Sequence, residues 1–232
     1  MSTRSIVIIT ALEEEAAHIA EACDDVEHVR RASLDVIRGT LATDAGDTLH
    51  VAVAVGGMGT VNAAATTQFL IDLAAPDAVL FSGIAGNLNP ALHVNDVVLG
   101  GTLRYLDTDM RLVGQWKPGT EEFHSDPALV ALAEAALDDM GITHVTGTIA
   151  TGNYFVDTPE LSAKIVRETG ADAVEMEGAA VAHVAARNDL PALVIRAMSD
   201  NTDTDYEEFR EFDISEYADT AAKLVVTMLR RM

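Results

Sequence analysis

The sequence has 232 residues, of which 49% are hydrophobic, and its 37 acidic against 15 basic side chains give a formal net charge of −22. This composition predicts a folded domain rather than a disordered acidic chain, and the charge argues against nucleic acid or an anionic membrane as a partner. With one cysteine, Cys23, and no apolar run long enough to cross a bilayer, we expect a cytoplasmic protein.

The first half of the chain predicts strands that alternate with helices. Residues 5–10 are apolar and β-branched, which is typical of a buried strand, and residues 11–21 are rich in helix formers. Three further short apolar or alternating segments are expected to be strands: residues 34–41, 48–55 and 78–81.

Two glycine-rich turns are expected where strands end, at residues 56–59 and 82–86. Turns of this kind let backbone N–H groups approach a ligand, which makes Met58, Gly59, Ala85 and Gly86 candidate binding residues. Taken alone, however, each segment is better interpreted as an ordinary tight turn after a strand. Neither turn has the spacing of a dinucleotide or P-loop motif. Thr60 is expected to cap a helix at residues 61–73.

The second half continues the alternation after an irregular stretch at residues 107–125. Residues 94–105 predict one or two strands, and residues 201–213 an acidic loop. The other expected elements are helices at 127–140, 159–168, 178–188 and 214–231 and strands at 144–150, 173–176 and 193–199. The pattern predicts one domain over residues 1–232, a three-layer α/β/α fold with a central mixed, mainly parallel sheet. Ligands bind such sheets at the carboxyl ends of the strands.

The segment around Glu175 and Glu177 carries the most informative chemistry. Two carboxylates at i and i+2 lie on the same side of a strand that is expected to be buried. Buried carboxylates are costly unless they are paired or hydrogen-bonded, and a pair of ribose hydroxyls would satisfy one of them.

Asp200 ends another apolar strand, after Arg196 and Ser199. Burial favours a protonated carboxyl, as a general acid requires, although an aspartate that caps the next segment is an equal alternative. The acidic run Glu13–Glu15 by itself indicates only a helix N-terminus, where the dipole favours negative charge.

Six segments together resemble a known family: ITALEEEA, VGGMGTVNAA, FSGIAGNL, TGNYF, AVEMEGAAVAHVA and IRAMSD. They spread in order from residue 9 to residue 200. The set resembles the nucleoside phosphorylase family, and most closely its hydrolytic branch, the 5′-methylthioadenosine/S-adenosylhomocysteine nucleosidases. The chain departs from that pattern at Ile84, where a smaller residue is frequent, and at Asn153, where aspartate is frequent.

The resemblance implies an enzyme that hydrolyses the N-glycosidic bond of a purine nucleoside and releases adenine, without metal or organic cofactor. Glu15 would activate water with help from Arg196, and Asp200, oriented by Ser199, would protonate N7 of the base. The remaining residues would bind substrate: Glu177 and the Met176 backbone the ribose, Phe155 and the Val156 backbone the purine, and Met58 and Tyr206 the 5′ substituent.

Alternatives remain open. A phosphate-dependent phosphorylase would need an anion site, yet the segments around Glu15 and the glycine turns contain no arginine or lysine. Other nucleosides, such as futalosine or inosine, would suit the same mechanism, and a purine-nucleoside binding protein is the non-enzymatic alternative. The resemblance also implies a homodimer, with residues 107–118 near its interface. An acidic surface with three lysines resembles proteins from salt-loving organisms.

Overall fold

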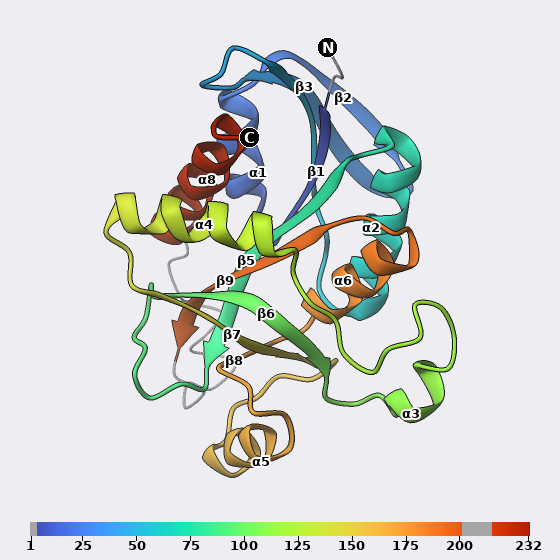
Figure 1. The fold of residues 1–232 in the computed structure, drawn as a ribbon, viewed down its shortest axis with the longest axis vertical. Helices are drawn as coiled ribbons and strands as arrows, with labels where there is room; N and C mark the ends of the chain where they lie inside the picture. The colour runs from blue at the N-terminus through green and yellow to red at the C-terminus, as the bar shows by residue number, and fades with distance from the viewer. Residues whose placement is uncertain (1–3, 201–214) are drawn as a thin grey trace.

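A computed structural model describes residues 4–200 and 215–232. Its centre is a nine-stranded sheet in the order β2-β3-β4-β1-β5-β8-β7-β6-β9 (Figure 1). The strands are β1 (Arg4–Thr10), β2 (Asp24–Arg31), β3 (Leu34–Ala42), β4 (Thr48–Val55), β5 (Ala78–Asn87), β6 (Val97–Tyr105), β7 (His144–Thr151), β8 (Ala173–Glu175) and β9 (Ala192–Asp200).

The sheet is mixed and closes on itself at one end. β1 runs parallel to β4 and β5, and β6–β7, β7–β8 and β5–β9 are also parallel. The pairings β2–β3, β3–β4, β5–β8 and β6–β9 are antiparallel. Because β9 pairs with both β6 and β5, the strands β5, β8, β7, β6 and β9 form a closed hydrogen-bonded circuit.

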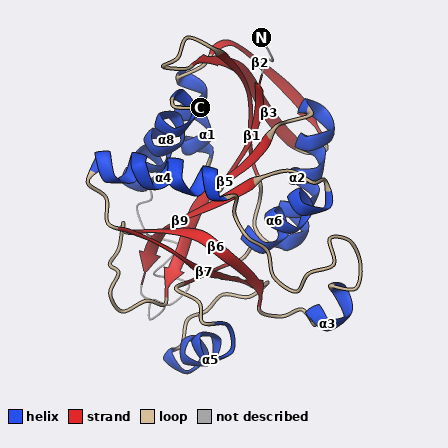
Figure 2. Cartoon of the chain, viewed as in Figure 1, coloured by secondary structure: helices blue, strands red, loops and turns tan. Residues whose placement is uncertain are grey.

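Helices cover both faces of the sheet (Figure 2). The helices are α1 (Glu13–Glu21), α2 (Thr60–Ala74), α3 (Met110–Val113), α4 (Pro127–Met140), α5 (Pro159–Thr169), α6 (Gly178–Arg187) and α8 (Ser215–Arg230). One apolar core lies under α1, α4 and α8, and a second lies under α2 and α6. The three-layer mixed α/β fold expected from the sequence is therefore confirmed. None of the described helices combines the length and apolarity that a membrane crossing requires.

Local signals placed α4 correctly at both ends. Asp126 accepts hydrogen bonds from the N–H groups of Ala128 and Leu129, and Pro127 occupies the first turn. Gly141 ends the helix in the left-handed region at φ 68°. Each of these groups lies within a few residues of the helix end that it defines.

Three expectations about elements were wrong. β2 was missed because nearly all its residues are exposed, so no alternation of apolar and polar side chains marks it. Residues 82–86 do not form a turn: β5 continues through them, since β8 and β9 hydrogen-bond to this part of the strand. Thr60 is not the cap of α2. Gly59 holds that position, and the Thr60 hydroxyl donates to Asn153 Oδ1 at 2.9 Å.

Two other segments are more regular than expected. Residues 94–105 give a single strand, β6, which begins at Val97. The stretch at 107–125 contains the one-turn helix α3 and a bridge between Leu103 and Phe123. The acidic loop expected at residues 201–213 lies outside the described residues.

Candidate active site

A cavity of about 490 Å³ opens where β1, β8 and β9 end and β5 passes between them. This is the edge of the sheet at which the sequence analysis expected a ligand. Ten of the predicted site residues line it: Met58, Ala85, Gly86, Phe155, Val156, Glu175, Met176, Glu177, Ser199 and Asp200. Gly59 contacts the lining through Glu177. Glu15 and Arg196 are buried behind it. Tyr206 falls outside the described residues.

Glu175 is bound entirely within the protein. Its Oε1 accepts a hydrogen bond from the Thr151 hydroxyl, and its Oε2 accepts from the N–H groups of Glu177 at 2.9 Å and Gly178 at 2.7 Å. Arg196 donates to the same Oε2 from Nε and Nη2, at 3.2 and 2.5 Å. Glu175 therefore borders the cavity, but its carboxylate is occupied by hydrogen bonds that hold the turn from β8 into α6.

Arg196 is the buried cation of the site. Its guanidinium lies over the Phe81 ring, 3.9 Å from the centroid, and its Nη2 is 3.5 Å from Glu177 Oε2. The side chain fits only because residue 83 is glycine: a Cβ there would come within 2.0 Å of Nη1. Among the described residues, Nη1 has no hydrogen-bond partner, so one end of the guanidinium is available to a ligand or to water.

Glu177 projects toward the cavity from the start of α6. Its Oε1 accepts a hydrogen bond from the Gly59 N–H at 2.7 Å, which joins the glycine turn before α2 to the end of β8. Burial, and then the negative charge of Glu175, raise the pKa of Glu177 to about 7, although Arg196 opposes the shift. A carboxylate in this state accepts strongly from hydroxyl donors such as those of a ribose.

Glu15 is fully buried on the first turn of α1. Neither of its carboxylate oxygens has a hydrogen-bond partner within the described part of the chain. Burial raises the pKa of Glu15 to about 7, while the nearby Ser82 hydroxyl and the charge of Arg196 lower it. A carboxylate with a pKa close to neutral pH suits proton abstraction. Of the three acids in the run Glu13–Glu15, only this one points inward.

Asp200 is the last residue of β9 and lines the cavity. Its Oδ2 accepts a hydrogen bond from the Ser199 hydroxyl at 2.7 Å, and Ser199 Oγ also lies 3.2 Å from the Ala85 carbonyl oxygen. Both side chains are buried. The serine hydroxyl thus fixes the orientation of the Asp200 carboxyl group.

The segment after β7 forms the apolar side of the cavity. Phe155 and Val156 line it, and Val156 is buried. Asn153 holds this segment in place: its Oδ1 accepts from the Thr60 N–H and hydroxyl, while its N–H and Nδ2 donate to Asp107 Oδ2. The asparagine that departs from the family pattern therefore has a defined positioning contact on both sides.

Several residues of the site were not predicted from the sequence. Phe81 supports Arg196, Thr151 holds Glu175, and Ser82 lies beside Glu15. Their signal was weak because each is an ordinary residue of a buried strand and gains its role only from strands far away in sequence. Within residues 4–200 and 215–232 there is no cluster of His, Cys, Asp and Glu side chains that could hold a metal ion.

Comparisons with known proteins agree with this geometry. The sequence model of the phosphorylase superfamily matches residues 5–230. A 5′-methylthioadenosine/S-adenosylhomocysteine nucleosidase from Shewanella sediminis is 32% identical over 237 residues, which cover 98% of this chain and 99% of that protein. The resemblance inferred from the six motifs is thereby confirmed.

Solved structures extend the likeness to the fold. The 5′-methylthioadenosine/S-adenosylhomocysteine nucleosidase from Neisseria meningitidis, in complex with methylthio-immucillin-A, has a TM-score of 0.89 and 31% identity, covering 99% of this chain and 100% of that one. The futalosine hydrolase of Helicobacter pylori has a TM-score of 0.85 and 29% identity, with complete coverage of both chains.

Proposed function

Since the chain belongs to the phosphorylase superfamily, we propose that its cavity is the active site of an N-glycosyl hydrolase. The enzyme hydrolyses the N-glycosidic bond of a purine nucleoside. The observation that carries this proposal is that the carboxyl groups of Glu177 and Asp200 line one cavity at the carboxyl ends of the strands, while Glu15 is buried behind that lining beside Ser82 and Arg196.

In the proposed mechanism, different residues act on the purine and on the ribose, the two groups joined by the bond that breaks. Asp200, held by Ser199, donates a proton to N7 of the purine and so stabilises the leaving base. Glu177 accepts hydrogen bonds from the ribose hydroxyls, with the Met176 backbone beside it. Positive charge develops on the ribose, and the carboxylates near the sugar stabilise it. Glu15 takes a proton from the attacking water, and Arg196 helps to hold that water.

We infer that the substrate is 5′-methylthioadenosine or S-adenosylhomocysteine, which gives adenine as a product. The names of the related nucleosidases and the full-length coverage of the likeness support this choice. Phe155 would stack on the purine, the Val156 backbone would bind its edge, and Met58 would contact the 5′ substituent. Futalosine is the alternative substrate, because a futalosine hydrolase is almost equally similar.

Hydrolysis is favoured over phosphorolysis by the charges at the site. No lysine or arginine is among the described residues that line the cavity. Arg196, behind the lining, is paired with Glu175 through two of its nitrogens. Glu15, once ionised, would repel a phosphate dianion from the position of the nucleophile.

The decisive experiment measures adenine release from 5′-methylthioadenosine in molar salt, with and without phosphate. We expect release that does not depend on phosphate, with free methylthioribose as the second product. Release only in the presence of phosphate would make the protein a phosphorylase. If no adenine appears in either buffer, futalosine and inosine are the next substrates to assay, and tight binding without turnover would indicate a binding protein.

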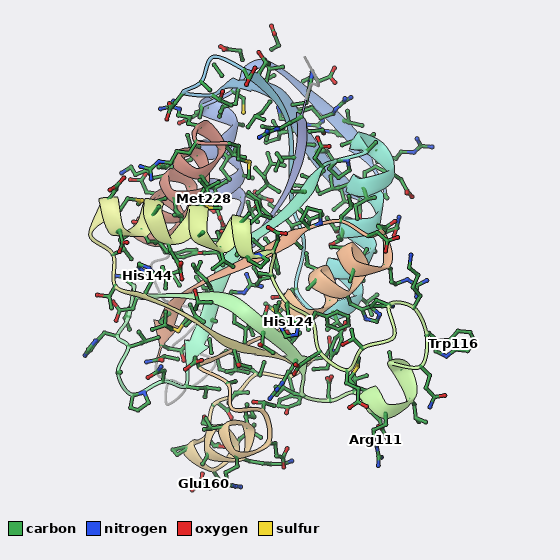
Figure 3. The ribbon with its side chains drawn as sticks, viewed as in Figure 1. Arg111, Trp116, His124, His144, Glu160 and Met228 are labelled. Atoms are coloured by element: carbon green, nitrogen blue, oxygen red, sulfur yellow. The ribbon has the colours of Figure 1, made fainter. Side chains whose placement is uncertain are left out.

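We also propose that the active form is a homodimer. Large apolar side chains are exposed on the described surface: Val61 on α2 is 79% exposed, Leu112 on α3 64% and Trp116 after α3 76%. Trp116 points outward at the end of its loop (Figure 3). Met58, on the rim of the cavity, is 64% exposed, so a partner at this face would adjoin the site. Light scattering should give twice the monomer mass, and a monomer in molar salt would contradict the proposal.

We propose finally that the protein works in a reducing, salt-rich cytosol. Its single cysteine is a free thiol, and its net charge of −22 favours conditions in which salt screens self-repulsion. Nucleic acid and anionic membranes are not expected partners, for the same electrostatic reason. Cell fractionation with an antibody to the native protein would test the location.

A further inference from the structure

Four buried polar side chains, one of them the proposed base, lie together, and each has polar atoms without a hydrogen-bond partner among the described residues. They are both carboxylate oxygens of Glu15, the Ser82 hydroxyl, Arg196 Nη1 and the Tyr217 hydroxyl, none of which has a partner among the described residues. Tyr217 did not feature in the sequence analysis. Unpaired buried polar groups are costly, and a group of them in one place indicates a site that functions with something bound.

The four groups come from four elements that the fold brings together. Ser82 on β5 pairs with Thr10 at the end of β1 and with Ile195 on β9. Its neighbour Gly83 pairs with Arg196, whose Nη1 lies directly against the Gly83 backbone. The guanidinium end therefore lies next to Ser82, behind the wall of the cavity formed by Thr10, Ala11 and Phe81.

The helices supply the other two groups. Glu15 is on α1, which follows β1, and α1 packs against α8, the helix that carries Tyr217. Tyr217 is 7% exposed and belongs to the same core as Ile19 of α1. Electrostatic contact joins its hydroxyl to Ser82, to Glu15 and to Arg196. The phenol thus closes the side of the cluster that faces α8.

We propose that Tyr217 is a positioning residue for the base Glu15, which it orients by donating a hydrogen bond to the carboxylate, directly or across one water molecule. The proposal rests on the proposed function of Glu15. Of the four groups, only the ionised carboxylate is purely an acceptor, whereas the phenol, the serine hydroxyl and the guanidinium can all donate. One water molecule held between these groups would accept from the donors and donate to the carboxylate.

The phenol remains a donor throughout the working pH range. Burial, and then the nearby charge of Glu15, hold the pKa of Tyr217 well above its usual range. A donor facing the carboxylate favours its ionised form and so opposes the rise in pKa that burial causes. Tyr217 would thereby keep a larger fraction of Glu15 ionised, as a base must be.

Few other charged groups bear on Glu15 among the described residues. Arg196 faces it from β9, with Glu175 and Glu177 on the far side of the guanidinium. One turn further along α1, His18 pairs with Asp219 of α8 at 3.4 Å, and both of these side chains are partly exposed. The phenol is therefore the neutral donor that α8 contributes to this base.

The test is the titration of Glu15 in Tyr217→Phe, which removes the hydroxyl and keeps the ring. Carboxyl-carbon NMR of glutamate-labelled protein would follow the titration, with the Glu15 resonance assigned by its loss in Glu15→Gln. We expect the midpoint of Glu15 to rise by about one pH unit, the size of a hydrogen bond to a charged group. The ascending limb of kcat/KM against pH should move upward with it.

Two further variants keep the result interpretable. Ser82→Ala should shift the midpoint of Glu15 in the same direction, which gives a second measurement should Tyr217→Phe not fold. Tyr105→Phe is the matched control, because the hydroxyl of this largely buried tyrosine contacts His183 instead, and it should leave Glu15 unchanged. An unchanged midpoint in folded Tyr217→Phe would overturn the proposal. The titration needs no turnover, so it remains informative even if the wild-type protein releases no adenine.

Discussion

The carboxyl groups of Glu15 and Glu177 have similarly raised pKa values, although their surroundings differ. Burial raises the pKa of each to about 7, but Glu15 is opposed by Ser82 and Arg196, whereas Glu177 is pushed further by the charge of Glu175. Glu177 has the Gly59 N–H as a partner, and Glu15 has none among the described residues. Two carboxyl groups with pKa values near neutrality, one lining the cavity and one buried behind it, are characteristic of a catalytic site rather than a structural one.

The raised pKa of Glu15 predicts a pH-dependent effect of Glu15→Gln on stability. The folded state binds the Glu15 proton more tightly than the unfolded state, so this contribution is fully present below about pH 4.5 and is lost as the pH rises through about 7. Replacing the carboxylate by an amide should therefore stabilise the protein more at pH 8 than at pH 5, by about 2–3 kcal/mol.

Urea unfolding of Glu15→Gln and wild type at the two pH values would measure this difference. Glu14→Gln is the control, because Glu14 is exposed on the same helical turn and should give equal effects at both pH values. Equal effects for Glu15→Gln as well would show that the buried carboxyl does not titrate in this range.

Asp200→Asn is predicted to abolish turnover while largely retaining ligand binding. The amide keeps the shape of the side chain next to Ser199 but has no acidic proton for N7 of the purine. We expect kcat to fall at least about 100-fold, the typical contribution of a general acid, with little change in the Kd of an adenosine analogue. Isothermal titration and adenine release on the same preparation would measure both, and an active variant would refute the acid role.

At the scale of elements, β5 is the strand on which the site depends. It pairs with β1, β8 and β9, and at Gly83 it gives Arg196 the room to reach Glu175. Gly83→Ala should therefore displace the guanidinium and loosen the turn that carries Glu177. We expect a loss of about 1–3 kcal/mol in stability, as in other overpacked cores, and at least a tenfold fall in kcat/KM.

A control variant that loses a similar amount of stability far from the cavity separates the effect of Gly83→Ala on stability from its effect on kcat/KM. Asp126→Ala removes the cap of α4, remote from the cavity, and should cost about 1 kcal/mol of stability. Its kcat/KM should stay at the wild-type value. If Gly83→Ala retained full activity, the space beside Arg196 would not be required for catalysis.

The same scale explains what could be predicted from the sequence. α4 was predicted from end to end because Pro127 and Gly141 act on their immediate neighbours, and the cap by Asp126 is equally local. The course of β5 through residues 82–86 was not, because strands more than 80 residues further along the chain provide its hydrogen bonds. Glu175, Glu177 and Asp200 were found by their apolar surroundings and Glu15 only through the family resemblance, while Tyr217, about 200 residues from Glu15, lies in no local pattern that marks it.

For the whole molecule, the dominant feature is the excess of 22 negative charges. At about 1 M salt the screening length shortens to about 3 Å, so repulsion between surface carboxylates is largely removed. We predict that the midpoint of thermal unfolding rises steadily from dilute buffer to molar NaCl. Sucrose at equal osmolality is the control for solute exclusion, and equal stability in dilute and molar salt would contradict the proposed adaptation.

The closed circuit of strands affects how readily molecules of this protein can associate through their sheet edges. Because β9 pairs back onto β5, β2 is the free edge of the described sheet, and its sequence DDVEHVRR is charged along almost its whole length. Exposed edges invite strand addition between molecules, and charged side chains discourage it. We therefore expect the charges of β2 to discourage aggregation through this edge of the described sheet, even where salt weakens the general repulsion between copies.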